Sequence, residues 1–137
     1  MWGKLKAASV VVLLTVASCT PTVPIYQLKI SGNTIQVPVS GFENSSVNIV
    51  HDNQSVYELV LIKKSPLMYD SYFLQCTNDK TALEVTPDDI HCPKCHSVFD
   101  FEGVVKSGPA TESLLKFPTE LNSDKSLVTI NIQALNL

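Results

Sequence analysis

Three cysteines and two histidines are grouped in the middle of the 137-residue chain. His91, Cys92, Cys95 and His96 fall within six residues, and Cys76 precedes them. Thiolates and imidazoles are ligands of zinc and of iron–sulfur centres. The residue types and their spacing therefore predict a metal centre.

The pair Cys92-Pro-Lys-Cys95 is open to more than one interpretation. Two thiolates at this spacing can bind one tetrahedral ion, as in a zinc knuckle. A thioredoxin-like redox pair is less favoured, because such a pair lies at a helix N-terminus that lowers the thiol pKa. Cys76 alone is compatible with a small buried residue. With Cys19 set aside for lipidation, an odd number of thiols remains, which argues against a plain disulfide scaffold.

Residues 90–110 resemble the second cluster-binding loop of a Rieske iron–sulfur domain. The loop of that family runs Cys-Pro-x-His-Gly-Ser-x-Phe, followed by a glycine turn and then Gly-Pro-Ala. The matching residues are Cys92, Pro93, Ser97, Phe99, Gly103, Gly108, Pro109 and Ala110. The resemblance spans roughly residues 35–132. It implies an antiparallel β-sandwich with a small cluster-binding hairpin subdomain. It also implies a [2Fe–2S] cluster bound by two thiolates and two imidazoles.

The first loop of the family, Cys-x-His, corresponds to residues 76–78. Asn78 stands where the family has histidine, and an amide oxygen is a weak ligand for iron. His91 is an alternative fourth ligand if its loop folds inward. The resemblance therefore implies an altered ligand set, drawn from Cys76, Asn78, Cys92, Cys95 and His96.

The second loop can be aligned with the family in two ways. Without a gap, Cys92 keeps its thiolate role, Cys95 takes the place of the second histidine, and His96 replaces the glycine. If Lys94 is an insertion, His96 regains the imidazole role and Cys95 becomes a spare thiol. The alignment without a gap is preferred because it preserves the match at Ser97.

Three functions are compatible with this site. The first is electron transfer through an altered [2Fe–2S] centre, with an unknown redox partner protein. The second is a binding or structural module that has lost the cluster and has disulfide-linked loops, and the third is a zinc-bound version of the same site. An enzyme is not expected, because Rieske oxygenases carry a separate mononuclear iron domain for which this chain has no room.

The elements that would position these residues are short strands. Apolar or alternating runs at 25–30, 35–39, 47–50, 56–62, 72–75, 98–101, 104–106, 114–117 and 127–132 are separated by turn residues. Strands at spacings of 8–12 residues are typical of an all-β sandwich or small barrel. Only residues 88–92 and 112–115 could hold a helical turn.

The N-terminus resembles a lipoprotein signal peptide, residues 1–19. Lys4 and Lys6 precede a short apolar run, and small residues lead to Cys19. The run is too short for a membrane-spanning helix, which needs about 20 residues. We expect lipidation at Cys19, a tether and first strand over 20–34, and a Rieske-like domain over 35–137. This places the protein in the cell envelope, anchored to a membrane and facing the periplasm or the cell exterior.

The charge balance does not favour nucleic acid as a partner. The formal net charge is −3, and about −5 once the signal peptide is removed. Proteins that bind nucleic acid usually carry a basic patch, often beside aromatic side chains. The sequence has no such patch.

Lipidation is tested by Cys19→Ser. The variant should move from the membrane fraction to the soluble fraction, because it lacks the thiol that would carry the lipid. Fractionation followed by immunoblotting measures this. A variant that stays in the membrane with its signal peptide uncleaved would contradict ordinary lipoprotein processing.

Overall fold

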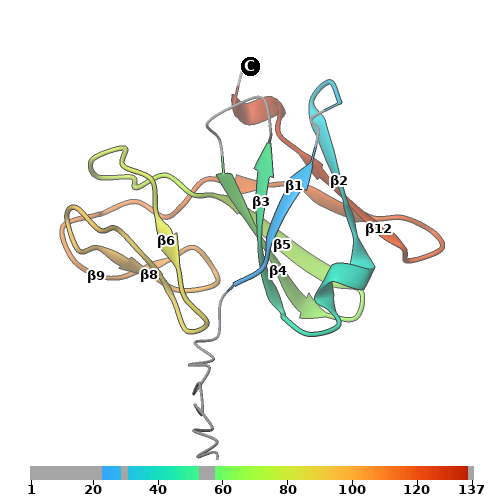
Figure 1. Cartoon of the computed structure of the whole chain (residues 1–137). Coiled ribbons are helices and arrows are strands. Elements are labelled where there is room, and N and C mark those ends of the chain that lie inside the picture. The colour runs from blue at the N-terminus through green and yellow to red at the C-terminus, as the bar shows by residue number, and fades with distance from the viewer. Residues whose placement is uncertain (1–22, 29–30, 53–57, 136–137) are drawn as a thin grey trace, which may run out of the picture.

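The structure is a computed structural model that describes residues 23–28, 31–52 and 58–135 (Figure 1). The described chain is all-β with mainly antiparallel sheets, which confirms the predicted fold class. The predicted signal peptide and Cys19 lie outside the described residues. Two packed sheets lie on one side of the molecule and a smaller sheet lies on the other (Figure 1).

The central layer is a five-stranded sheet. β1 is paired in parallel with β3, and the other neighbours are antiparallel. In spatial order the strands are β1 (Ile25–Leu28), β3 (Val47–Asp52), β4 (Glu58–Ser65), β5 (Met68–Phe73) and β10 (Lys116–Phe117).

A three-stranded antiparallel sheet forms a second layer. Its order is β11 (Thr119–Leu121), β12 (Leu127–Asn131) and β2 (Thr34–Pro38). A 3-10 helix, η1 (Val39–Phe42), follows β2, and a second, η2 (Gln133–Leu135), follows β12.

The small sheet has four short strands in sequence order. They are β6 (Glu84–Val85), β7 (Ile90–His91), β8 (Val98–Phe99) and β9 (Val105–Ser107). All neighbouring pairs are antiparallel. This small sheet lies in the part of the chain where the resemblance to Rieske domains implies a cluster-binding hairpin subdomain.

β4 lies between two hydrophobic cores and so connects the three sheets. Leu59, Val60, Leu61 and Ile62 are all at most 3% exposed. Successive side chains of a strand point to opposite faces. Leu59 and Leu61 therefore pack in the core shared with the three-stranded sheet. Val60 and Ile62 pack in the core shared with the small sheet. The continuous apolar run is thus a strand covered on both faces.

The small sheet is joined to the central sheet by apolar packing. Phe99 and Ile90 are fully buried and belong to the same core cluster as Val60 and Tyr72. At Gly103, in the turn between β8 and β9, an added Cβ would lie 2.7 Å from the Tyr72 ring. The small sheet is therefore held closely against the central one.

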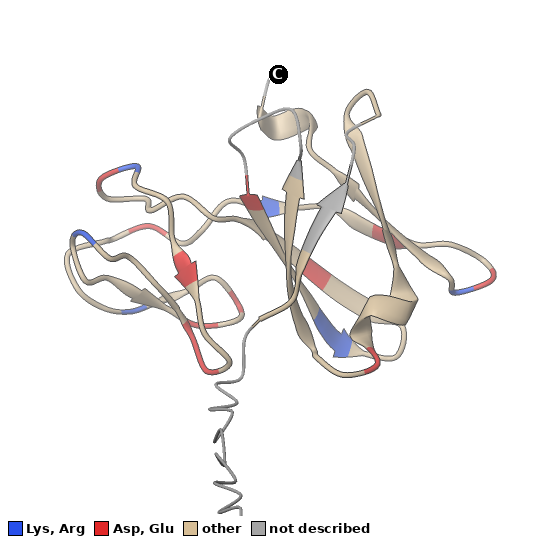
Figure 2. Ribbon diagram, viewed as in Figure 1, with Lys and Arg blue, Asp and Glu red and all other residues tan. Residues whose placement is uncertain are grey.

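Charged residues lie in small groups along the described ribbon (Figure 2). In the described part of the chain, ion pairs join Lys116 to Asp70, Lys64 to Glu102, His51 to Glu58 and His91 to Glu84 across neighbouring strands or hairpins. In the described part of the chain, no helix is long and apolar enough to cross a membrane.

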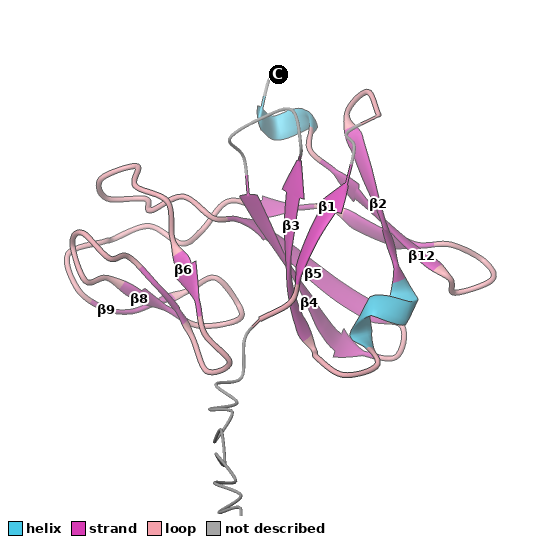
Figure 3. Cartoon of the chain, in the orientation of Figure 1, coloured by secondary structure: helices cyan, strands magenta, loops and turns pink. Residues whose placement is uncertain are grey.

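The helical turns expected at 88–92 and 112–115 are not formed (Figure 3). Ile90 instead pairs with Phe99 in the small sheet. Burial of this apolar pair outweighs the local preference of a short polar segment for a helical turn.

Phe99→Ala tests the packing of the small sheet. Truncating a fully buried aromatic ring should lower the free energy of unfolding by about 3–5 kcal/mol, measured by chemical denaturation. The matched control is Val104→Ala in the same hairpin, because Val104 is 47% exposed and its truncation should cost less than about 0.5 kcal/mol. A Phe99→Ala loss as small as that of the control would contradict the packing.

Candidate metal centre

Two turns with the same backbone geometry form the centre. We call residues 76–81 the first turn and residues 92–97 the second turn. In the first turn the Lys80 N–H donates to the Cys76 carbonyl at 2.9 Å, and the Cys76 N–H donates to the Thr81 carbonyl at 2.8 Å. In the second turn His96 donates to Cys92 at 3.0 Å, and Cys92 donates to Ser97 at 2.8 Å.

The fifth residue of each turn adopts the same unusual conformation. Lys80 and His96 both have φ of 62°, in the left-handed region that glycine occupies most easily. This residue reverses the chain, so that the side chains at the first and fourth positions face the same way. Each turn thus offers two side chains separated by two residues.

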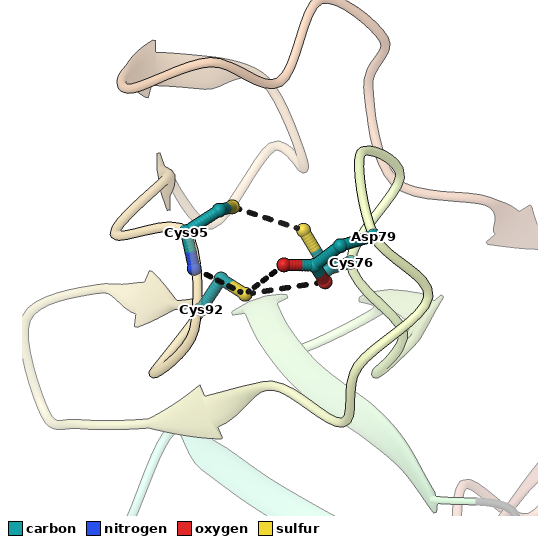
Figure 4. A group of neighbouring side chains, drawn as sticks. All are labelled: Cys76, Asp79, Cys92 and Cys95. Carbon is teal, nitrogen blue, oxygen red and sulfur yellow. Dashed lines mark hydrogen bonds between the residues drawn. The ribbon is translucent and has the colours of Figure 1, made fainter.

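Four ligand atoms converge where the turns meet (Figure 4). The first turn supplies Cys76 and Asp79, and the second supplies Cys92 and Cys95. One ligand atom from each residue lies within 4.8 Å of all the others. This Cys/Asp group could bind a metal ion.

Direct contacts connect the two turns. The Cys76 and Cys95 sulfurs are 3.6 Å apart. The Cys92 thiol lies 3.6 Å from each carboxylate oxygen of Asp79. Within the second turn, the Cys95 N–H donates to the Cys92 sulfur at 3.5 Å. The Cys76–Cys95 and Cys92–Asp79 contacts each join a first-position residue to a fourth-position residue.

Burial and hydrogen bonding shift the pKa values of two of these residues in opposite directions. Cys76 is fully buried, and this burial raises the pKa of its thiol to about 11. Asp79 is only half-buried, and the Thr81 N–H donates to its Oδ1 atom at 3.0 Å. This hydrogen bond lowers the pKa of the Asp79 carboxyl, which favours the ionised form that a metal ligand needs.

Ser97 supports Cys95 from inside the protein. Its hydroxyl is fully buried, accepts the Ala110 N–H at 3.0 Å, and lies 3.1 Å from the Cys95 sulfur. Because the oxygen accepts from Ala110, its hydrogen is available to the sulfur, and this hydrogen bond lowers the pKa of Cys95. Gly108 allows the close approach, since an added Cβ would lie 2.5 Å from the Ser97 Cα.

Two residues of the expected ligand set are not in this group. Asn78 and His96 are both exposed, and the group of four does not include them. His91 lies 3.0 Å from Glu84 and 3.4 Å from Asp89, in the hairpin of β6 and β7. It is therefore paired with carboxylates outside the group.

Asp79 is the candidate ligand that the sequence did not point to. The family pattern directs attention to Asn78, one residue earlier. The available signal was the spacing, since Cys76-x-x-Asp79 repeats the interval of Cys92-x-x-Cys95. Equal spacing within two equal turns places Asp79 where the second turn has Cys95.

Comparison with known proteins gives no family assignment. No protein-family model matches the chain, and no curated protein matches it. The geometry of the Cys76, Asp79, Cys92 and Cys95 group is therefore the basis for proposing its function.

His96→Gly distinguishes a turn-forming role from a ligand role. Glycine adopts a positive φ without the steric cost of a side chain. The variant should therefore keep its metal affinity and be more stable by up to about 1 kcal/mol. Lys80→Gly, at the equivalent position of the first turn, is the matched control and should behave in the same way. Titration with zinc and chemical denaturation measure the two quantities. Loss of metal affinity in His96→Gly alone would identify His96 as a ligand.

Proposed function

We propose that this protein is a membrane-anchored, Rieske-like module of the cell envelope whose centre binds a single tetrahedral metal ion, zinc in particular. The observation that carries the proposal is the convergence of three thiols and one carboxylate within 4.8 Å. Thiolate and carboxylate are both established zinc ligands.

The distances within the group fit one four-coordinate ion. With zinc–sulfur bonds of about 2.3 Å, two sulfurs of a tetrahedral site lie about 3.8 Å apart. A sulfur and a carboxylate oxygen lie about 3.5 Å apart in such a site. The Cys76–Cys95 and Cys92–Asp79 separations are both 3.6 Å. These two separations are therefore close to the lengths of two edges of the required tetrahedron.

A [2Fe–2S] cluster fits this group less well. Its four ligands are divided between two irons. Two ligands on different irons are separated by the iron–iron vector as well as by two iron–ligand bonds, so they lie further apart than two ligands of one ion. A group in which every ligand atom is within 4.8 Å of the others favours a mononuclear site.

A structural role for the metal ion follows from this set of four protein ligands. Four protein ligands leave no open position for a substrate, as in structural zinc sites. Zinc also has no redox chemistry of its own. The ion would join the first turn to the second and so stabilise the end of the small sheet, in a module that binds or supports other envelope components.

Electron transfer through an altered [2Fe–2S] centre is the second candidate. The match of residues 90–110 to the Rieske loop favours it, together with the hydrogen bond from Ala110 to Ser97 that orders this loop. A third thiolate in place of an imidazole adds negative charge and disfavours the reduced state. Such a cluster would have a potential moving toward the roughly −400 mV of plant-type ferredoxins.

Metal analysis separates the two candidates. The protein, purified anaerobically, should be colourless and contain one zinc ion per chain. Asp79→Ala should lower zinc affinity by more than the ~10–100-fold that loss of an outer-sphere partner costs, because a direct ligand is lost.

The matched control is Asn78→Ala, which changes the neighbouring exposed residue and should leave zinc affinity unchanged. A coloured protein with two irons per chain would overturn the zinc proposal in favour of a cluster. Equal losses of affinity in the Asp79 and Asn78 variants would contradict the ligand assignment.

A further inference from the structure

The centre contains one half-buried cysteine in direct contact with a fully buried one. Cys95 is half-buried, whereas Cys76 is fully buried, and their sulfurs are 3.6 Å apart. The two residues come from different turns, so a bond between them would join the two turns covalently. Cys92 is also fully buried.

We propose that the centre is also a thiol–disulfide switch, in which a disulfide oxidant converts Cys76 and Cys95 into a disulfide and the metal ion is released. The inference depends on the proposed metal site, whose regulation it describes. It assigns different roles to the three thiols: Cys95 reacts first, Cys76 completes the bond, and Cys92 stays reduced.

The first step is attack by the Cys95 thiolate on one sulfur of the oxidant, R–S–S–R. The oxidant's S–S bond breaks, a mixed disulfide Cys95–S–S–R forms, and one thiolate, RS⁻, leaves. Attack requires a thiolate with access to the oxidant. Metal binding also requires the thiolate form, and Cys95 is the least buried of the three cysteines.

In the second step the Cys76 thiolate attacks the Cys95 sulfur, and a second RS⁻ leaves. The two protein thiolates lose two electrons in total, and the oxidant gains them as it becomes two thiolates. The sulfurs must approach from 3.6 Å to the ~2.05 Å of a disulfide bond. Both residues lie in turns, where the backbone can adjust.

Metal release follows from the ligands that remain. Only Cys92 and Asp79 are left, and their side chains are 3.6 Å apart before oxidation. Two ligands do not satisfy the four-coordinate geometry of a structural zinc site. An oxidising cell envelope is a compartment in which disulfides form and persist, so the reaction has an oxidant of the required class there.

The test uses the zinc-loaded full chain and oxidised glutathione as the oxidant. Zinc release is followed with a chromogenic chelator, and the disulfide is mapped by mass spectrometry of tryptic peptides without reduction. Trypsin cleaves after Lys80, Lys94 and Lys106, which places the three thiols in separate peptides. The expected product links peptide 65–80 to peptide 95–106, with peptide 81–94 unlinked and zinc released.

Two variants form a matched pair, because each removes one thiolate ligand. Cys92→Ser should still give the link between peptides 65–80 and 95–106. Cys95→Ser should give no internal disulfide, and its zinc release should be at least about tenfold slower because the accessible nucleophile is missing. Peptide mapping remains informative even if a variant binds zinc weakly.

The possible failures are distinguishable. Zinc content before the oxidant is added tests the proposed metal site alone. A disulfide that includes peptide 81–94, a linked product that still holds its zinc, or zinc released with Cys76 and Cys95 still reduced would each overturn the switch.

Discussion

Convergence of four potential anions at one point is the constraint on which the rest of the site depends. Two turns of equal geometry bring three thiols and a carboxylate within 4.8 Å. If all four were ionised without a cation, like charges would face one another in a partly buried space. Without a cation, burial raises the pKa of the Cys76 thiol, so this thiol stays protonated and one of the four negative charges is absent. A bound divalent cation would offset these charges instead, and it would also order both turns.

The scaffold keeps these turns in place through the hydrophobic core. Cys76 and Cys92 belong to the same buried cluster as Phe99 and Val60. One ligand of each turn is therefore anchored in the interface between the small sheet and the central sheet. The other ligand of each turn, Asp79 or Cys95, lies nearer to solvent. This arrangement gives the site a buried inner half and a more exposed outer half.

The sequence predicted the fold better than it predicted the ligands. The apolar run at 56–62 predicted a strand, which the structure has as β4, and the all-β class followed from the turn spacing. The Rieske resemblance drew attention to the two segments that meet. It did not identify Asp79, because a pattern match does not encode which side chains of a turn face inward. That depends on the left-handed conformation of Lys80 and His96, which a single sequence does not reveal when neither residue is glycine.

The most direct measurement is zinc K-edge X-ray absorption spectroscopy of the metal-loaded protein. The account predicts a mononuclear site with three sulfur neighbours at about 2.3 Å and an oxygen neighbour at about 2.0–2.2 Å. Imidazole scattering from a histidine ligand, or a shell with fewer than three sulfurs, would contradict the Cys76, Asp79, Cys92 and Cys95 ligand set.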